Sequence, residues 1–367
     1  MAEITHISET IDVIEPTLMS ATGHCYSFLN SLCKVSKEIP LCLWVNRNID
    51  VAFAGQNVQV KRFFYRRIRR LQSYVLYKKL LAAQGKLFIS TAGTTDLILL
   101  DWASTGKISR GKVYLYFHWI NISDRKLTNL RKIAKKQPNL MILGPTPSVI
   151  NTFQQAGFEN ARIVPYPISG QTLHGKTEHN DFTGLLYAGA ARQDKGVSYV
   201  VDLVEYMSKQ ELQIPFRLQN SPDHRGKYDA VTKAEIQRLE KIPYPYLQLF
   251  PETLKPDEYA SLFVGAICIQ LYSAAVFSDR ISGVTLDALS AGSPIVSTAG
   301  TWTARMVERF NAGVIVDSPE PEKILSAIQR IIDEYPRYNK NASTAGQILQ
   351  QENSAEFLYN TLVEQPG

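Results

Sequence analysis

Apolar and polar positions alternate in a repeating pattern along most of this chain. Short apolar runs that fit buried strands are followed by stretches with apolar residues at helical spacing, which is typical of a mostly parallel sheet covered by helices. The predicted strands of the first half are 11–14, 41–45, 87–89, 113–117, 140–143 and 162–164. A second series comprises 185–188, 216–219, 247–250, 266–271, 294–297 and 313–316. The expected fold class is α/β, with two Rossmann-like domains.

A proline-containing and then polar stretch separates the two series. Pro165 and Pro167 precede residues 169–181, where Gly, Thr and His are frequent, and this composition indicates a hinge. We therefore expect an N-terminal domain over 1–168, a hinge over 169–181, a second domain over 182–345, and a C-terminal segment over 346–367. A helix is predicted over 354–363 in that last segment.

Size and composition are those of a globular protein with two domains. The chain has 367 residues, of which 45% are hydrophobic and 20% charged. Its four cysteines form no CxxC pair and have no His partner at metal-ligand spacing, which favours a reduced, cytoplasmic protein. No signal peptide and no run of eighteen apolar residues is visible, so we expect no membrane span.

The net charge of +6 is unevenly distributed between the halves. Residues 1–170 contain 22 Lys and Arg against 10 Asp and Glu, whereas the remainder contains 18 against 24. A basic first half favours an anionic surface or a phosphate-bearing acceptor.

Segment 61–81 is the most basic part of the chain and is predicted to be an amphipathic helix. Phe64, Ile68, Leu71 and Val75 fall at helical spacing and form an apolar stripe. The cations are Lys61, Arg62, Arg66, Arg67, Arg69, Arg70, Lys78 and Lys79, and the five arginines are candidates for a membrane or acceptor surface. Such a helix can rest on anionic lipid. Alternatively, its stripe packs on the sheet and its charges are solvated. No nucleic-acid-binding module accompanies it, which argues against a nucleic-acid partner.

A basic loop follows the first strand of the second series. Residues 187–196 contain a small-residue turn and then Arg192 and Lys195, directly before a helix predicted over 197–207. Arginine offers a bidentate fork and lysine a mobile charge, so the loop suits a diphosphate. The alternative is a solvated basic turn.

Two carboxylates eight residues apart bracket a glycine-containing turn in segment 278–296. Asp279 precedes the turn, and Asp287 lies in the helix that follows it. A helix N-terminus leaves backbone N–H groups that bind anions, and the candidates here are those of Ser282, Gly283, Val284 and Thr285. The alternatives are helix capping for Asp279 and a surface carboxylate for Asp287.

These segments resemble two signatures of retaining glycosyltransferases of the GT-B fold, particularly those like family 4. Asp279 and Asp287 match an E-x7-E signature with Asp in place of both Glu residues, and 189–196 looks like a G-x-x-R-x-x-K-G segment. The resemblance implies two Rossmann-like domains facing across a cleft, of which 1–168 binds the acceptor and 182–345 the nucleotide-sugar donor, with a C-terminal helix within 346–367 crossing back to the first. It implies that Arg192 and Lys195 grip the nucleotide diphosphate, that Asp287 binds the ribose, and that Asp279 faces the transferred sugar. Loop 297–302 resembles the turn that closes such sites.

The first domain carries two further candidates. Gly23 lies in a turn similar to the glycine loop that faces the donor phosphate in this family, although a plain turn between strand and helix fits equally well. His118 follows the predicted strand 113–117, where a family-like histidine contacts the transferred sugar. The alternative is a hydrogen-bonded core histidine with Trp119 packed beside it.

The resemblance implies a glycosyltransferase that moves a hexose from a nucleotide-diphosphate sugar to a glycan or lipid-linked acceptor. Retention of configuration and a role in bacterial surface polysaccharide synthesis at the inner face of the cell membrane follow by analogy. No DxD pair occurs, so no metal and no other cofactor is expected. The alternatives are a sugar-nucleotide epimerase on the same fold and a non-catalytic sugar- or lipid-binding homologue. UDP and GDP remain equal candidates for the nucleotide.

Overall fold

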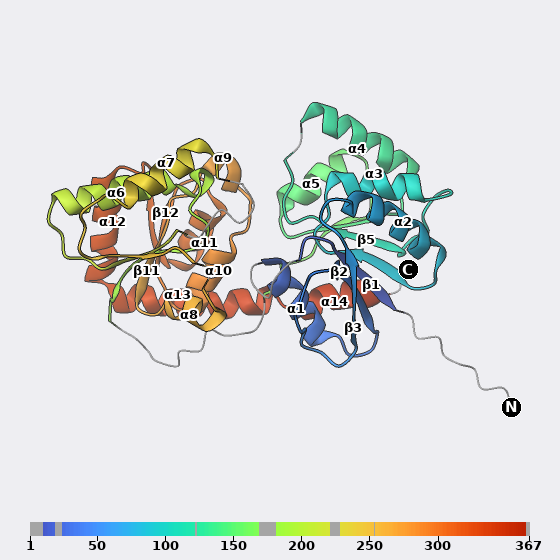
Figure 1. Cartoon of the computed structure of the whole chain (residues 1–367), viewed down its shortest axis with the longest axis horizontal. Helices are drawn as coiled ribbons and strands as arrows, with labels where there is room; N and C mark the ends of the chain where they lie inside the picture. The colour runs from blue at the N-terminus through green and yellow to red at the C-terminus, as the bar shows by residue number, and fades with distance from the viewer. Residues whose placement is uncertain are drawn as a thin grey trace. The chain divides into compact units, whose positions relative to one another are not determined.

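The computed structural model describes residues 10–18, 24–121, 123–168, 181–220, 228–252 and 254–364 (Figure 1). The chain divides into two compact units. The first consists of Met1–Gly170 and Glu352–Gly367, and the second of Gln171–Gln351. Both are parallel α/β units, as the sequence pattern predicts. The predicted hinge lies outside the described residues except for Asp181.

The first unit is built on a seven-stranded sheet in the order β3-β2-β1-β4-β5-β6-β7, with every neighbouring pair parallel. Its strands are β1 Ile11–Glu15, β2 Leu41–Asn46, β3 Val58–Phe64, β4 Lys86–Ile89, β5 Val113–Tyr116, β6 Met141–Gly144 and β7 Ala161–Ile163. All six strands predicted for the first half are confirmed, with small shifts at their ends. Both faces of the sheet are covered, which explains the nearly continuous apolar runs.

Helices cover the two faces of this sheet unequally. They are α1 His24–Val35, α2 Arg69–Ala82, α3 Thr94–Ala103, α4 Asp124–Lys136, α5 Pro147–Gln155 and α14 Ala355–Val363. One core cluster joins the sheet to α2, α3, α4 and α5, and the other joins it to α1 and α14. The alternation of side chains along each strand supplies both clusters, since Ile14 faces the first and Val13 the second.

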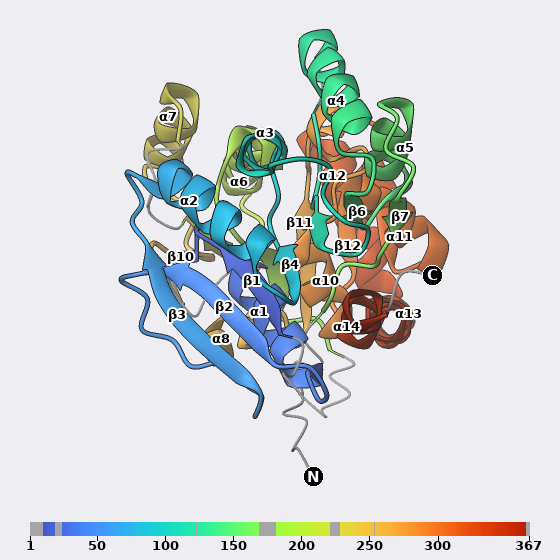
Figure 2. The same cartoon turned by 90° about the vertical axis from the view of Figure 1, so that its right-hand side faces the viewer.

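The basic segment differs from its prediction. Residues 58–64 form β3, a strand paired with β2 at the end of the sheet (Figure 2), and the helix begins only at Arg69. The face of α2 that packs inward carries Leu76, Tyr77 and Leu80. An edge strand that is solvated on one side has fewer apolar positions than a buried strand. The apolar positions of β3 were therefore assigned to the helix that follows it.

The C-terminal helix α14 belongs to the first unit, as expected. Leu358 and Leu362 lie in the core cluster beneath α1. The buried ammonium of Lys86 donates to the carbonyls of Leu362, Val363 and Glu364 at 2.8, 3.1 and 3.0 Å. A cation at the carbonyl end of a helix is favourable because it meets unpaired C=O groups and the negative end of the helix dipole.

The second unit has a six-stranded parallel sheet in the order β10-β9-β8-β11-β12-β13. Its strands are β8 Gly184–Tyr187, β9 Phe216–Gln219, β10 Leu247–Phe250, β11 Ala266–Gln270, β12 Ile295–Thr298 and β13 Gly313–Val316, and they confirm the second predicted series. Its helices are α6 Val197–Lys209, α7 Ala230–Leu239, α8 Pro256–Ser261, α9 Ala274–Phe277, α10 Gly283–Ser290, α11 Trp302–Phe310, α12 Pro321–Asp333 and α13 Tyr335–Glu352.

Helix α13 carries the second unit further along the chain than residue 345. Gly346 of α13 packs against α10, and a Cβ atom at residue 346 would stand 2.5 Å from the carbonyl oxygen of Leu289. Only glycine allows this approach of two backbones. The helix therefore stays with the second unit until Gln351.

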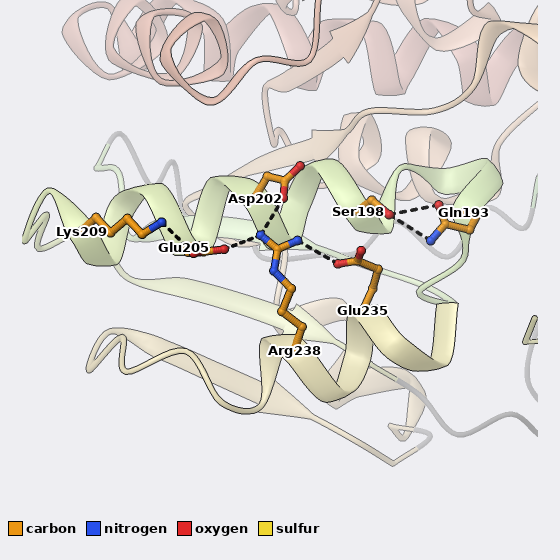
Figure 3. Close-up of polar contacts among 7 residues, drawn as sticks. All are labelled: Gln193, Ser198, Asp202, Glu205, Lys209, Glu235 and Arg238. Atoms are coloured by element: carbon orange, nitrogen blue, oxygen red, sulfur yellow. Dashed lines mark hydrogen bonds and ion pairs between the residues drawn. The ribbon is translucent and has the colours of Figure 1, made fainter. Parts of the chain in front are cut away.

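An ion network fastens α7 to α6 (Figure 3). Arg238 of α7 reaches Asp202 at 2.8 Å and Glu235 at 3.2 Å, and it also bonds Glu205, which accepts a 2.7 Å contact from Lys209. These side chains are partly exposed, so their stabilising effect comes from the network more than from any single pair.

Candidate functional site

The two chemically promising loops of the second unit follow strands β8 and β11. The chain order of the sheet reverses between these two strands, and parallel sheets bind ligands beyond the carboxyl ends of strands at such a point. The amide of Ser273 donates to the carbonyl of Asp194 at 3.0 Å and joins the two loops directly. The fold thus brings together loop 187–196 and segment 278–296, which the sequence pattern indicated separately.

Glycines shape the basic loop. Gly196 adopts a φ of +78°, and a Cβ there would stand 2.1 Å from the carbonyl oxygen of Leu271. Gly189, with a φ of +89°, donates its amide to the side chain of Gln219 at 2.7 Å. Between them lies the 3₁₀ turn Gln193–Lys195, whose Gln193 exchanges hydrogen bonds with Ser198 of α6 (Figure 3). The loop is consequently held in one shape.

Arg192 directly precedes this turn and Lys195 ends it, and both are predicted diphosphate ligands. The guanidinium of Arg192 donates to both carboxylate oxygens of Asp194, at 2.9 and 2.7 Å. The Lys195 ammonium lies 5.5 Å from the ring centre of Tyr272 and 3.0 Å from the position that a Cβ at residue 189 would take. Burial lowers the pKa of Lys195 to about 8, and the charge of Arg192 contributes in the same direction.

The turn at 282–285 forms the predicted helix N-terminus. Ser282 caps α10, and its side-chain oxygen accepts from the amide of Thr285 at 3.3 Å. The Thr285 hydroxyl is buried and donates to Gln270 at 2.6 Å, so this residue has a structural role. Within the described parts of the chain, the amides of Gly283 and Val284 have no acceptor. These two N–H groups are available to an anion.

Asp287 lies on the inner side of α10 and is partly buried. The hydroxyl of Tyr259, from α8, donates to its Oδ2 atom at 3.0 Å. Burial raises the pKa of Asp287 to about 6, while the Tyr259 hydrogen bond and the charge of Lys195 act in the opposite direction. A helix-surface carboxylate would be solvated and would keep a low pKa, so this geometry favours a binding role.

Asp279 is held in an ion pair. The guanidinium of Arg305, from α11, bonds its Oδ1 atom at 2.7 Å and also donates to the carbonyl of Ser278 at 2.5 Å. Ser282, and not Asp279, caps α10. The side chain of Asp279 is about a quarter exposed.

Three residues at this site were not selected from the sequence: Tyr259, Arg280 and Arg305. Arg280 approaches Asp194 at 3.9 Å and lies 4.9 Å from the ring centre of Phe277. Its place inside the matched signature was a usable signal. Tyr259 and Arg305 come from other helices, and nothing in their local sequence indicates contact with Asp287 or Asp279.

Loop 297–302 serves the fold. The buried hydroxyl of Thr301 caps α11 by accepting from the amide of Ala304 at 3.0 Å, and Ser297 Oγ lies 3.2 Å from it. The loop thereby fixes the start of the helix that carries Arg305.

In the first unit, His118 follows β5 and is partly buried. Its Nε2 atom lies 2.8 Å from the carbonyl oxygen of Ser90, and its ring packs against Phe28, Tyr116 and Tyr166. Trp119 is nearly half exposed. The hydrogen bond and the ring contacts hold the imidazole in one orientation. A contact between His118 and the transferred sugar stays a prediction. Gly23 lies outside the described residues.

A buried carboxylate lies at the corresponding reversal of the first sheet, between β1 and β4. Glu15 accepts hydrogen bonds from the hydroxyls of Thr17, Ser90 and Thr91. These bonds satisfy a charge that is almost fully buried. They also fix Ser90, whose carbonyl oxygen contacts His118.

The predicted basic surface is present on the first unit. Arg66, Arg67 and Arg70 are exposed, and Arg62 is paired with Asp50 at 3.2 Å. Arg69, at the start of α2, is partly exposed. The four residues of the predicted stripe separate: Phe64 is buried at the end of β3, whereas Ile68, Leu71 and Val75 are exposed by 49, 64 and 56%. The alternative of an inward-facing stripe is therefore wrong for these last three residues and holds for Phe64 alone.

In the described ranges, no group of three or more His, Cys, Asp and Glu side chains is arranged to hold a metal ion. None of the helices in these ranges combines the length and apolar character needed to cross a bilayer.

Comparison with known proteins gives structural relatives only. No family model and no curated protein sequence matches the chain. Among solved structures, HepE from Anabaena in complex with UDP-glucose has a TM-score of 0.69 at 14% identity, covering 96% of this chain and 98% of HepE. Sucrose-phosphate synthase from Thermosynechococcus elongatus gives 0.68 at 14% identity, covering 96% and 99%.

A third relative is WaaG, a glycosyltransferase involved in lipopolysaccharide biosynthesis. It gives a TM-score of 0.65 at 12% identity and covers 97% of this chain and all of WaaG. TM-scores of 0.65 to 0.69 establish the fold, whereas identities of 12 to 14% leave the substrates open. The chain shares the GT-B fold with these three structures over nearly its whole length.

Proposed function

We propose that this protein is a glycosyltransferase that takes a hexose from a nucleotide-diphosphate sugar. The observation that carries the proposal is the convergence of Arg192, Lys195 and the amides of Gly283 and Val284 with Asp287, all from the loops and helix after β8 and β11. Cations and amides suit the diphosphate, and a carboxylate suits the vicinal hydroxyls of a ribose.

The chemistry we propose is stabilisation of the departing diphosphate. Negative charge grows on the leaving oxygen as the glycosidic bond breaks, and fixed cations and N–H groups lower the energy of that state. Arg192 and Lys195 would take this role without a metal. Asp279, oriented by Arg305, would contact the transferred sugar, and His118 would assist there. Retention of configuration belongs to the same proposal.

UDP-glucose is the first donor to test, because HepE was solved with it. We further propose a glycan or lipid-linked acceptor in bacterial surface polysaccharide synthesis. WaaG, which is involved in lipopolysaccharide biosynthesis, supports that choice by analogy.

We also propose that the first unit touches the cytoplasmic face of an anionic membrane through α2. The support is the outward apolar stripe of Ile68, Leu71 and Val75 beside Arg66 and Arg70. Trp102, on the neighbouring helix α3, is 67% exposed. Apolar side chains flanked by arginines suit the boundary between headgroups and acyl chains.

The deciding experiment combines calorimetry with donor turnover. UDP and GDP are titrated without metal into the full-length protein, into Lys195→Ala, and into Lys209→Ala as a control for loss of a surface charge on the same unit. We expect one nucleotide to bind, the first variant to lose at least tenfold in affinity, and the control to match the wild type.

Turnover of the donor then separates the alternatives. Hydrolysis or transfer of the hexose supports the transferase, an isomerised donor would indicate an epimerase, and binding without turnover would indicate a binding protein. Failure of both nucleotides to bind would refute the proposed donor site.

A further inference from the structure

Asp194 lies between two arginines that come from different loops. It accepts both hydrogen bonds of the Arg192 fork, at 2.9 and 2.7 Å, and its Oδ2 atom lies 3.9 Å from the Arg280 guanidinium. All three side chains are about a quarter exposed. A carboxylate and a phosphate offer an arginine fork the same pair of acceptors, so Asp194 has the chemistry of a bound phosphate oxygen pair.

The charges in this cluster do not cancel. Arg192, Arg280 and Lys195 lie around Asp194, and the charge of Lys195 also acts on Asp287, so three cations face two carboxylates. Proximity to Arg192 lowers the pKa of both Lys195 and Arg280, next to the larger effect of burial. Like charges held this close favour binding of a further anion. A nucleotide sugar carries two negative charges on its diphosphate, which an excess of cations attracts.

Arg280 is also held in position. Its guanidinium lies over the ring of Phe277, at 4.9 Å from the ring centre. Its neighbour Asp279 is anchored by Arg305, and the Ser273–Asp194 backbone bond ties its segment to the basic loop. The ring contact and the anchored neighbouring segments fix where the Arg280 guanidinium lies.

We propose that Arg280 is a ligand of the donor's diphosphate, which exchanges its contact with Asp194 for the phosphate oxygens when the donor binds. This inference rests on the proposed function and adds to it a residue that binds the second phosphate. It places three cations around the leaving group, one from the segment after β11 and two from the loop after β8.

The test is a phosphate ladder. Affinities of uridine, UMP and UDP are measured by calorimetry for the full-length wild type, Arg280→Gln, Arg280→Lys and the surface control Lys209→Gln; if guanine is the base bound, the guanosine series replaces them. We expect the gain in affinity from UMP to UDP to fall about tenfold in Arg280→Gln, and by a smaller factor in Arg280→Lys, which keeps the charge but loses the fork. Uridine affinity and the gain in Lys209→Gln should not change.

The outcomes separate the two proposals. If the wild type binds UDP or GDP and Arg280→Gln keeps the full gain from the second phosphate, the role of Arg280 is refuted and the proposed function stands. If the wild type binds neither, the proposed function falls and takes this inference with it. Should Arg280→Gln fail to fold by circular dichroism, Arg280→Lys decides, since an unchanged gain there would also refute the fork.

Discussion

The hydroxyl of Tyr259 donates a 3.0 Å hydrogen bond to Oδ2 of Asp287, the carboxylate proposed to bind the ribose. This bond stabilises the ionised form, against burial, which favours the neutral one. Tyr259 is therefore a positioning residue that also helps to keep the Asp287 carboxylate ionised at neutral pH.

Tyr259→Phe should raise the pKa of Asp287 above its present value of about 6, because one hydrogen bond to the ionised form is lost. Donor binding would then need a higher pH. The measurement is UDP-glucose affinity against pH, since this donor has no terminal phosphate that titrates in the range. A purely structural role would lower affinity equally at every pH, and that result would contradict the prediction.

The wild type should show a bell-shaped dependence of UDP-glucose affinity on pH. Below about pH 6 Asp287 becomes protonated and loses an acceptor, and above about pH 8 Lys195 loses its charge. Asp287→Asn should abolish the acid limb and Lys195→Met the alkaline limb, each at a cost of about tenfold or more in affinity at pH 7. Limbs that persist unchanged in these variants would assign them to other groups.

The pKa of Asp287 also predicts an effect on stability. Because the folded-state pKa is raised, the folded protein binds the proton more tightly than the unfolded chain does. Its contribution to stability is therefore largest below about pH 4 and is lost as the pH rises through about 6. Asp287→Asn should raise the free energy of unfolding at pH 7 by about 1–2 kcal/mol, measured by urea denaturation. A variant less stable than the wild type at pH 7 would contradict this.

Asp279 and Arg305 should act as one unit. Each of Asp279→Asn and Arg305→Gln should slow UDP-glucose hydrolysis while leaving UDP affinity within about threefold, and the double variant should be no slower than the single ones. The pair is partly exposed, so stability should change by about 1 kcal/mol or less. Additive effects on the rate would show that the two side chains act separately.

Membrane contact through α2 makes a separate prediction. Leu71→Ser combined with Val75→Ser should weaken binding to phosphatidylglycerol vesicles by about tenfold or more, because two exposed apolar side chains no longer enter the bilayer surface. Phe357→Ser, at an exposed apolar position on α14, is the matched control and should bind like the wild type. Equal binding to pure phosphatidylcholine would refute the role of the arginines.

The sequence alone determined the architecture of this protein, because buried parallel strands and the helices between them have a strong local pattern. Twelve strands were predicted within a few residues, and β3 was missed, since an edge strand with a polar side has little apolar signal. Arg192, Lys195 and Asp287 were also proposed as site residues from the sequence, on short motifs set by glycine turns and a helix start.

The tertiary structure alone decided which side chains surround these residues. The reversal of strand order between β8 and β11 brings the loops together, and α8 and α11 deliver Tyr259 and Arg305 to the two aspartates. Partners so distant in sequence leave no periodic signal. The outward turn of Ile68, Leu71 and Val75 likewise depended on packing, because a helix whose other face already fills the core leaves its second apolar stripe exposed.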